Sequence, residues 1–368
     1  MTVATLLYTM VAVLATFIID DLGVSRAQLG WVLAVYSIAS AALSPSIGGI
    51  ADRLGAKRSM LGVYAFAGAG FLVMTRADTL TVMLGAALVA SFGQSMANPA
   101  TNKMIANEFL PGKRGLITGV KQSGVQMGTV IGGISFPALA FRYGWRSVPV
   151  LAAVAALALL AVAAWALPAD STTPAADTER ARLPSGIYWI MAYAFLMGVG
   201  GSPIFTFFPL YAHEVVGVSE ITAGLMVAVG GLAAVIARIM WSVRVERSGE
   251  YSGSLMTLSA MAVGSGILLL LAQPLGAVML WISVVAIFMS ISAWNSVAML
   301  AVITASGPSG AGRASGTVLL GFLSGLALSP PLFGWSVDRL ETYQPGFMAS
   351  VVMFALATLT MWMWRRRQ

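Results

Sequence analysis

Long apolar stretches separated by short polar segments dominate this chain. A helix needs about 20 mostly apolar residues to cross a hydrocarbon core about 30 Å thick. The pattern predicts twelve such membrane-spanning helices. The first six cover 2–19, 29–49, 58–75, 80–105, 115–141 and 147–167, and the second six cover 185–212, 221–243, 252–271, 276–305, 314–335 and 345–364.

Residues 168–184 form the longest polar segment and separate the two groups of six. This segment is rich in Pro, Ser, Thr, Asp, Glu and Arg and has no apolar periodicity, which is typical of a linker. The sequence therefore predicts an all-α integral membrane protein of two pseudo-symmetric six-helix bundles: an N-terminal bundle over 1–167, a cytoplasmic linker over 168–184 and a C-terminal bundle over 185–368. The first helix is short and no cleavable signal precedes it, so the natural chain is also compatible with a start further upstream.

Composition supports this class and excludes several kinds of chemistry. Hydrophobic residues make up 58% of the chain and charged residues 10%, against about 25% charged residues in soluble domains. The chain has no cysteine and one histidine, His213, which excludes disulfides, thiolate chemistry and a histidine-rich metal site. A phosphate-binding G-x-x-x-x-G-K-S/T run is also missing. We expect no catalytic residues, no metal and no cofactor.

The basic residues predict the orientation in the membrane. With both termini in the cytoplasm, fourteen of the 21 Lys and Arg fall in inside segments and five in outside segments, as the positive-inside rule requires. We expect a multi-pass protein of the inner (plasma) membrane. The net charge of +7 then reflects basic loops beside anionic headgroups, and no nucleic-acid partner is expected.

A charged motif recurs after the second and eighth predicted helices. The first copy reads G-x-x-x-D-R-x-G-x-K, and a degenerate copy, S-x-x-x-E-R-x-G, starts 194 residues later. An internal repeat of this kind is typical of transporters built from two similar halves. The residues concerned are Gly48, Asp52, Arg53, Gly55 and Lys57 in the first copy, and Glu246 and Arg247 in the second.

Twelve helices as six plus six, a central linker and this motif together resemble the major facilitator superfamily over essentially the whole chain. The resemblance implies that the motif gates transport, with Asp52 against the start of the eleventh helix near Arg313 and Gly316. A carboxylate near a helix N-terminus is favoured by about 0.3–1 kcal/mol. The alternative is that these charges only fix topology. The resemblance also implies a monomer.

Two further glycine patterns lie within predicted helices. Gly124, Gly128 and Gly132 of the fifth helix, with Gly115 and Gly133, resemble the family's antiporter motif C, but Thr129 stands where the family has proline. We therefore favour a close-packing glycine face over an antiporter role. In the seventh helix, the run from Gly200 to Pro203 predicts a break or a kink.

Two cations lie deep within predicted helices. Lys121 is seven residues beyond Arg114, and Arg238 is eight residues before Glu246, which places each about 10–12 Å inside its helix. Such charges usually face a cavity or a partner, and an anionic substrate or coupling ion would balance both. Alternatively, they reach the headgroups, or Arg238 binds backbone carbonyls. The predicted substrate-binding residues are Lys121, Arg238, Gln122, Gln126, Asn98 and Asn295.

The expected function is secondary active or facilitative transport of a small solute, an organic anion, by alternating access. The expected partners are this solute and the lipid bilayer. A proton relay lacks intramembrane Asp, Glu or His, with Asp20 and Asp21 the nearest candidates. The alternative is a multidrug or metabolite efflux antiporter for apolar or cationic compounds. A non-transporting sensor and a membrane enzyme are disfavoured, because a large soluble domain and a polar catalytic cluster are lacking.

Overall fold

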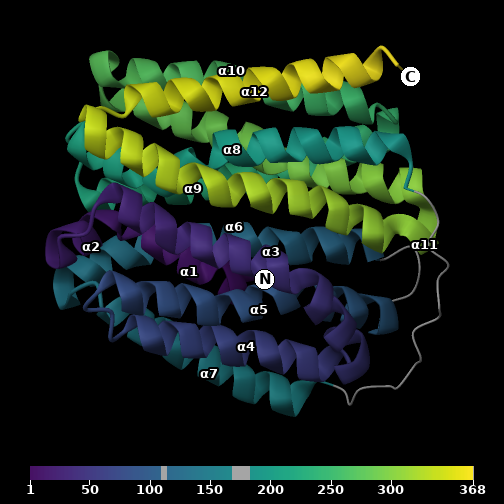
Figure 1. The fold of residues 1–368 in the computed structure, drawn as a ribbon, viewed down its shortest axis with the longest axis horizontal. Helices are drawn as coiled ribbons and strands as arrows, with labels where there is room; N and C mark the ends of the chain where they lie inside the picture. Colours follow the sequence, from purple (N-terminus) through teal and green to yellow (C-terminus); the bar gives the residue numbers. More distant parts are fainter. Residues whose placement is uncertain (109–113, 168–182, 368) are drawn as a thin grey trace. The chain divides into compact units, whose positions relative to one another are not determined.

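A computed structural model describes residues 1–108, 114–167 and 183–367 of the chain. It describes the backbone but not the side chains at 44–46, 48–53, 99, 102–108, 114–120, 122, 303, 304, 306–313 and 315. The described residues form helices and short turns, without a strand among them. The chain divides into two compact units, unit 1 (Met1–Asp177) and unit 2 (Thr178–Gln368) (Figure 1).

Unit 1 contains seven helices within its described residues. α4 packs against α5 and α7, α5 also packs against α3, and α1 packs against α6. α1 and α2 meet at an angle of 61°, so the first predicted span is bent. The helices are α1 (Thr2–Val13), α2 (Ala15–Leu22), α3 (Arg26–Leu54), α4 (Ala56–Met74), α5 (Leu80–Glu108), α6 (Arg114–Tyr143) and α7 (Ser147–Ala166).

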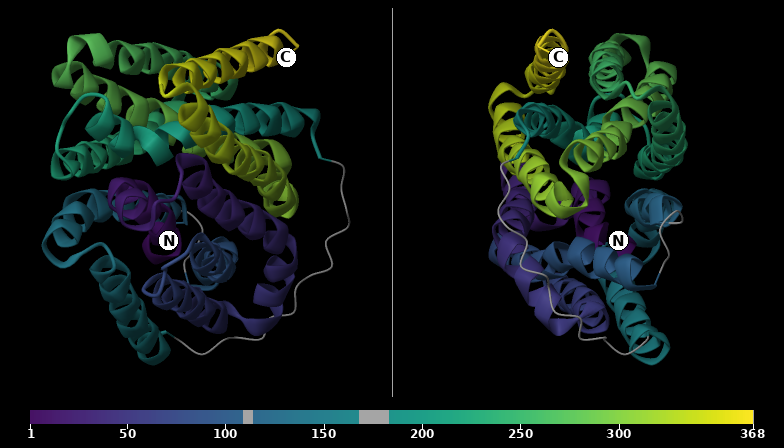
Figure 2. Two further views of the ribbon diagram at one scale, coloured as in Figure 1. Left: turned by 60° about the vertical axis from the view of Figure 1, so that its left-hand side comes forward. Right: turned by 90° about the vertical axis from the view of Figure 1, so that its right-hand side faces the viewer.

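Unit 2 is organised around its longest helix, α11, which packs against α8, α9 and α10. α12, drawn in yellow, packs against α8 and α10 (Figure 2). The helices of this unit are α8 (Ser185–Glu214), α9 (Glu220–Ser248), α10 (Tyr251–Leu275), α11 (Ala277–Leu340) and α12 (Gln344–Arg365).

Although α11 is 64 residues long, it folds back on itself. The rings of Trp294 and Phe322 pack edge to face with centroids 5.2 Å apart, whereas a straight helix would hold residues this far apart in sequence about 42 Å from each other. The two arms, Ala277–Val302 and Gly316–Leu340, are each long and apolar enough to cross a membrane. They correspond to the tenth and eleventh predicted spans, now joined by helical backbone.

The helices have the length and composition of a membrane protein. In the described part of the chain, nine helical stretches are long and apolar enough to cross a bilayer, and the bent α1–α2 pair would make a tenth. α3 and α4 are helical but are not among these stretches; the side chains of 44–46 and 48–53 in α3 lie outside the described residues, and α4 carries Lys57 and Arg58 in its first turn. The prediction of an all-helical protein is confirmed for the described residues. The number of twelve spans stays a prediction.

Helix α8 runs without a break from Ser185 to Glu214. The helix is not interrupted at 200–203, so of the two predicted forms only a kink remains, and Pro203 and Pro209 lie inside the helix. The Ser202 hydroxyl donates to the Leu326 carbonyl of α11 at 2.9 Å. The small residues in this part of α8 allow close packing against α11. The sequence pattern alone, with its proline, fits a packing role and a gating role equally well.

Three glycines bring α8 and the second arm of α11 into backbone contact. A Cβ atom at Gly198 would lie 2.5 Å from the Phe322 carbonyl oxygen, and one at Gly321 would lie 2.6 Å from the Met191 carbonyl oxygen. A Cβ atom at Gly325 would collide with the Phe195 carbonyl oxygen. Because these obstacles are backbone atoms, a side-chain movement cannot relieve them.

Replacing Gly198 or Gly325 by valine should therefore destabilise unit 2. Overpacking typically costs about 1–3 kcal/mol, and the expected result is a lower melting temperature of the detergent-purified protein, read by tryptophan fluorescence. Gly264→Val in α10 is the matched control, because no atom lies within 4 Å of a Cβ atom there. Equal melting temperatures for the three variants would contradict the packing argument.

Candidate functional site

The structure brings two of the predicted substrate-binding residues together in unit 1. Lys121 of α6 donates from Nζ to Asn98 Oδ1 of α5, across 3.2 Å. Both side chains are partly buried. This contact fixes the direction of the lysine side chain.

Gln94 belongs beside Asn98 in this group. It precedes Asn98 by one helical turn, which puts both on the same face of α5. Its Oε1 atom is buried and has no hydrogen-bond partner among the described residues, an arrangement that costs about 1–3 kcal/mol unless another group or a water donates to it. Of the two predicted glutamines of α6, Gln126 is buried at 6% exposure, and the side chain of Gln122 lies outside the described residues.

In unit 2, Arg238 links α9 to the first arm of α11. Its Nε atom donates to the Ser292 carbonyl oxygen at 2.9 Å, and the side chain is partly buried. This is the backbone contact that the sequence left open as an alternative. The bond also fixes the guanidinium in one orientation, and a fixed donor array suits an anionic ligand.

Ser292 itself is a feature that the sequence reasoning missed. Its side chain is 3% exposed, and its hydroxyl has no hydrogen-bond partner in the part of the chain that the structure describes. Most helical serines can donate to a carbonyl one turn earlier, so a buried serine hydroxyl without such a bond is unusual. The sequence gives one weak signal for it, a small polar residue shortly before Trp294 and Asn295.

Aromatic rings fix this part of α11. Trp294 is 2% exposed and packs edge to face on Tyr193 of α8, with centroids 5.8 Å apart. The Tyr193 hydroxyl donates to the Leu255 carbonyl oxygen of α10 at 2.9 Å. Asn295 follows Trp294 and is partly buried. The arrangement holds the polar residues of α11 on a rigid frame.

The first charged motif is helical rather than a loop. α3 continues to Leu54, and a single residue, Gly55, joins it to α4. Gly55 has φ 92° and ψ 172°, a conformation that side-chain-bearing residues rarely adopt. Lys57 donates from Nζ to the Leu167 carbonyl oxygen at the end of α7, across 2.8 Å. Of the motif residues, Gly48, Asp52 and Arg53 are described only by their backbone. The same holds for Arg313, the predicted neighbour of Asp52.

The second copy of the motif has a similar glycine. Glu246 and Arg247 are exposed in the last turn of α9, and Gly249, with φ 67°, joins α9 to α10. Gly55 and Gly249 both have positive φ between consecutive helices, but their ψ angles differ, at 172° and 3°, so the two turns have different conformations. Within the described ranges, no three His, Asp or Glu side chains are grouped so that they could hold a metal ion.

The glycines of α6 pack against α1. The Thr2 hydroxyl donates to the Gly124 carbonyl oxygen at 2.7 Å, and a Cβ atom at Gly132 would lie 2.7 Å from Thr9 Cγ2. These contacts support the close-packing interpretation of the glycine pattern.

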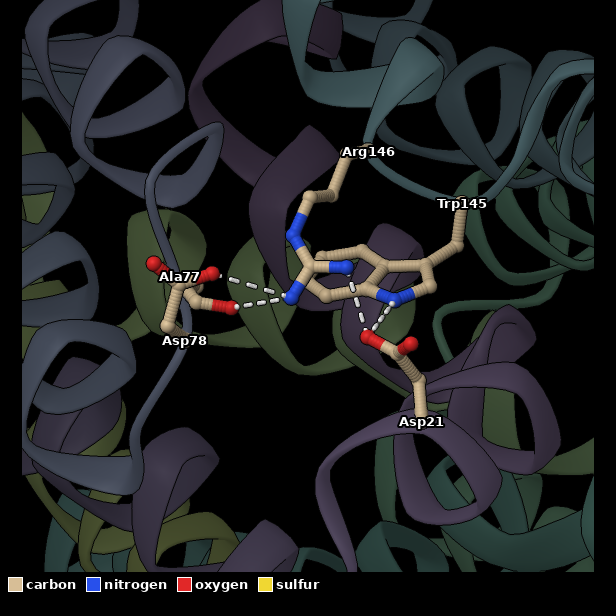
Figure 3. A network of polar contacts seen from close by, with 5 residues as sticks. All are labelled: Asp21, Ala77, Asp78, Trp145 and Arg146. Atoms are coloured by element: carbon tan, nitrogen blue, oxygen red, sulfur yellow. Dashed lines mark hydrogen bonds and ion pairs between the residues drawn. The ribbon is translucent and has the colours of Figure 1, made fainter.

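Arg146 is the centre of a polar network at one end of unit 1 (Figure 3). Its Nη1 atom donates to Asp21 Oδ2 at 2.6 Å, and its Nη2 atom donates to Asp78 Oδ1 and to the Ala77 carbonyl oxygen, both at 3.1 Å. Trp145 Nε1 also donates to Asp21 Oδ2, at 3.0 Å. The network ties the end of α2 to the turns before α5 and α7.

Asp21 lies beyond the apolar part of the first predicted span, and these contacts change its acidity. The hydrogen bonds from Trp145 and Arg146 lower the pKa of the Asp21 carboxyl below its ordinary value of 3.8. Asp21 therefore stays ionised near neutral pH. This makes it a poor proton carrier, although the sequence marked it as one of the nearest candidates.

The network should stabilise unit 1 in a pH-dependent manner. Because the folded-state pKa of Asp21 is depressed, its contribution is present above pH 3.8 and is lost as the pH falls through the lower folded-state value. We expect Asp21→Asn to melt below the unmodified protein between pH 5 and 7, and the difference to shrink below about pH 3.8. Because Arg146 and Asp21 are partly exposed, salt should weaken the effect.

Asp20→Asn is the control, because this exposed neighbour is not part of the network in Figure 3. A gap between Asp21→Asn and the unmodified protein that stays constant down to pH 3 would contradict the assignment.

Comparison with known proteins adds independent information. The sequence profile of the Major Facilitator Superfamily matches residues 1–322. The chain is 30% identical over 196 residues to a multidrug resistance protein B homolog of Mycobacterium tuberculosis (strain CDC 1551 / Oshkosh), covering 53% of this chain and 36% of that protein. It is also 30% identical over 140 residues to the hexuronate transporter of Bacillus subtilis (strain 168), covering 37% of this chain and 32% of that protein. The chain thus spans about a third of the length of these curated relatives.

The fold has a close counterpart among solved structures. A bacterial homolog of the human lysosomal transporter Spinster, in its inward-facing and unoccupied conformation, aligns with a TM-score of 0.81 over 98% of this chain and 94% of that chain. The sequence identity is 14%, so the likeness concerns the fold alone.

Proposed function

Because this chain belongs to the Major Facilitator Superfamily, we propose that it is a secondary active or facilitative transporter that moves a small organic anion across the membrane by alternating access. The observation that carries the choice of an anion is the pair of cations inside the helices, Lys121 of α6 and Arg238 of α9. Each is partly buried, and each donates to a neutral oxygen atom.

The balance of buried charge favours an anionic solute. In the described part of the chain, no Asp or Glu side chain is buried. Placing a cation at such a depth costs about 2.5–3.5 kcal/mol on insertion scales, and the negative group of a solute would offset part of this cost. Two buried polar atoms without a hydrogen-bond partner among the described residues are Gln94 Oε1 and Ser292 Oγ. In this proposal they add polar contacts to the uncharged part of the solute.

The relatives fit both transporter hypotheses. One is described as a hexuronate transporter, and a hexuronate is an organic anion. Another is described as a multidrug resistance protein B homolog, which fits the alternative of an efflux antiporter for apolar or cationic compounds. A cationic substrate would favour a buried carboxylate, so the residue inventory supports the anion.

The proposal includes the finer architecture. Twelve spans form two six-helix bundles, 1–167 and 185–368, joined by a cytoplasmic linker, in a monomer of the inner membrane with both termini inside. The charged motif and its copy act at the gate. The repeat of the motif in the sequence, with Gly55 and Gly249 each following its charged residues, supports related turns in the two halves.

The anion site predicts that a ligand stabilises the protein only while the cations are present. A carboxylate probe, galacturonate or gallate, should raise the melting temperature of the purified protein by mass action. A hydrogen bond to a charged group is worth about 1.5–3 kcal/mol, so Arg238→Gln and Lys121→Gln should each weaken probe binding about 10- to 100-fold. Uptake of the same probe into proteoliposomes should fall in parallel.

Arg244→Gln is the matched control, since Arg244 lies on the same helix as Arg238 and is exposed. Full binding by both cation variants would refute the anion site. Stabilisation by tetraphenylphosphonium alone, unchanged in the variants, would instead establish the efflux alternative.

The twelve-span topology predicts opposite labelling of two exposed positions. The chain has no cysteine, so single cysteines can be introduced without background. Thr79→Cys, between α4 and α5, should react with a membrane-impermeant maleimide in intact cells. Ser248→Cys, at the end of α9, should react only after the cells are opened. Labelling of both positions from outside would refute the proposed topology.

A further inference from the structure

An open pocket of about 320 Å³ lies at one end of unit 2. The start of α8, the junction of α9 and α10, the first arm of α11 and the end of α12 line it, and its walls include Gly186, Glu250, Tyr251, Ala301, Trp364 and Arg365. Its volume is at the lower end of the range of small-molecule pockets, about 300–1,000 Å³. Neither Arg238 nor Ser292 is among the residues that line the pocket, so the proposed anion site does not account for it.

One acidic and one basic side chain give the pocket its chemistry. Glu250 Oε2 and Arg365 Nη2 are 3.7 Å apart, which is longer than a good hydrogen bond. The Glu250 side chain is 64% exposed and the Arg365 side chain is 50% exposed. Each charged group therefore has capacity for a further partner, and the two lie close enough to meet the opposite charges of one small zwitterion.

Gly253 lies beside the two charged groups. A Cβ atom there would lie 3.0 Å from Glu250 Oε2 and 3.5 Å from Arg365 Nη1. The glycine at this position thus lets both charged groups approach the first turn of α10.

The surroundings of the pocket are those of a membrane headgroup region. The Arg366 guanidinium lies 3.7 Å from the centroid of the Trp362 ring, and the Arg367 guanidinium lies 5.1 Å from that of the Trp189 ring. Arginine and tryptophan together are typical of the level where helices leave the hydrocarbon core. Earlier on α12, Leu359 is 46% exposed, as expected for a lipid-facing side chain.

We propose that this pocket binds the headgroup of a phospholipid that carries both a phosphate and a primary ammonium, as phosphatidylethanolamine does. The ammonium donates to the Glu250 carboxylate, the phosphate accepts from the Arg365 guanidinium, and the acyl chains follow the exposed apolar face of α12. Charge complementarity selects this occupant: phosphatidylglycerol has no cation for Glu250, and the methylated ammonium of phosphatidylcholine has no N–H to donate.

The test compares three lipids with identical acyl chains on the purified full-length protein. Phosphatidylethanolamine, phosphatidylcholine and phosphatidylglycerol are each titrated in detergent, with the melting temperature and native mass spectrometry as readouts. We expect phosphatidylethanolamine to give the largest stabilisation and the most bound lipid. Equal effects of the three lipids, or a preference for phosphatidylglycerol, would overturn the proposed headgroup.

Three variants locate the binding. Glu250→Gln should weaken phosphatidylethanolamine binding about tenfold, and Ala301→Phe should reduce it by filling the pocket while keeping both charges. Arg367→Gln is the control, since this cation contacts Trp189 and is not among the lining residues. If Ala301→Phe fails to fold, Glu250→Gln still decides, because Glu250 is exposed. Unchanged binding in Glu250→Gln would overturn the site.

Discussion

The close approach of α8 to both arms of α11 is the contact on which unit 2 depends. In a bilayer, burial of apolar side chains between helices gains little over lipid, so helix association depends on van der Waals contact and interhelical hydrogen bonds. Gly198, Gly321 and Gly325 allow backbone contact with the second arm. Tyr193 packs against Trp294 on the first arm. One helix thus holds the folded-back α11 together.

The polar residues of unit 2 depend on that packing. Arg238 donates to a backbone carbonyl of the first arm of α11, next to the buried hydroxyl of Ser292. The Trp294 ring, two residues further on, contacts both Tyr193 and Phe322. The Arg238 side chain is therefore held in place against α11, and for the solute we propose this would lower the ordering cost of binding.

Unit 1 has polar contacts of two kinds. At one end, Arg146 joins two carboxylates and a carbonyl oxygen, which fixes the turns around it. Within the helices, Lys121 donates to Asn98, and Gln94 leaves an acceptor unused one turn away. The first group joins the turns at one end of the unit, whereas the second lies within the helices and contains the residues on which the proposed anion site rests.

The sequence by itself determined the helical class, the positions of most spans, the repeated motif and the two deep cations. These follow from apolar length, composition and spacing, which are local properties. The sequence also placed Asn98 of α5 among the predicted substrate-binding residues. Only the tertiary structure decided that Asn98 meets Lys121, that Arg238 binds the Ser292 carbonyl, and that helix α8 continues through Pro203. Each of these depends on which neighbouring helix supplies the contact, and a pattern along one chain does not contain that information.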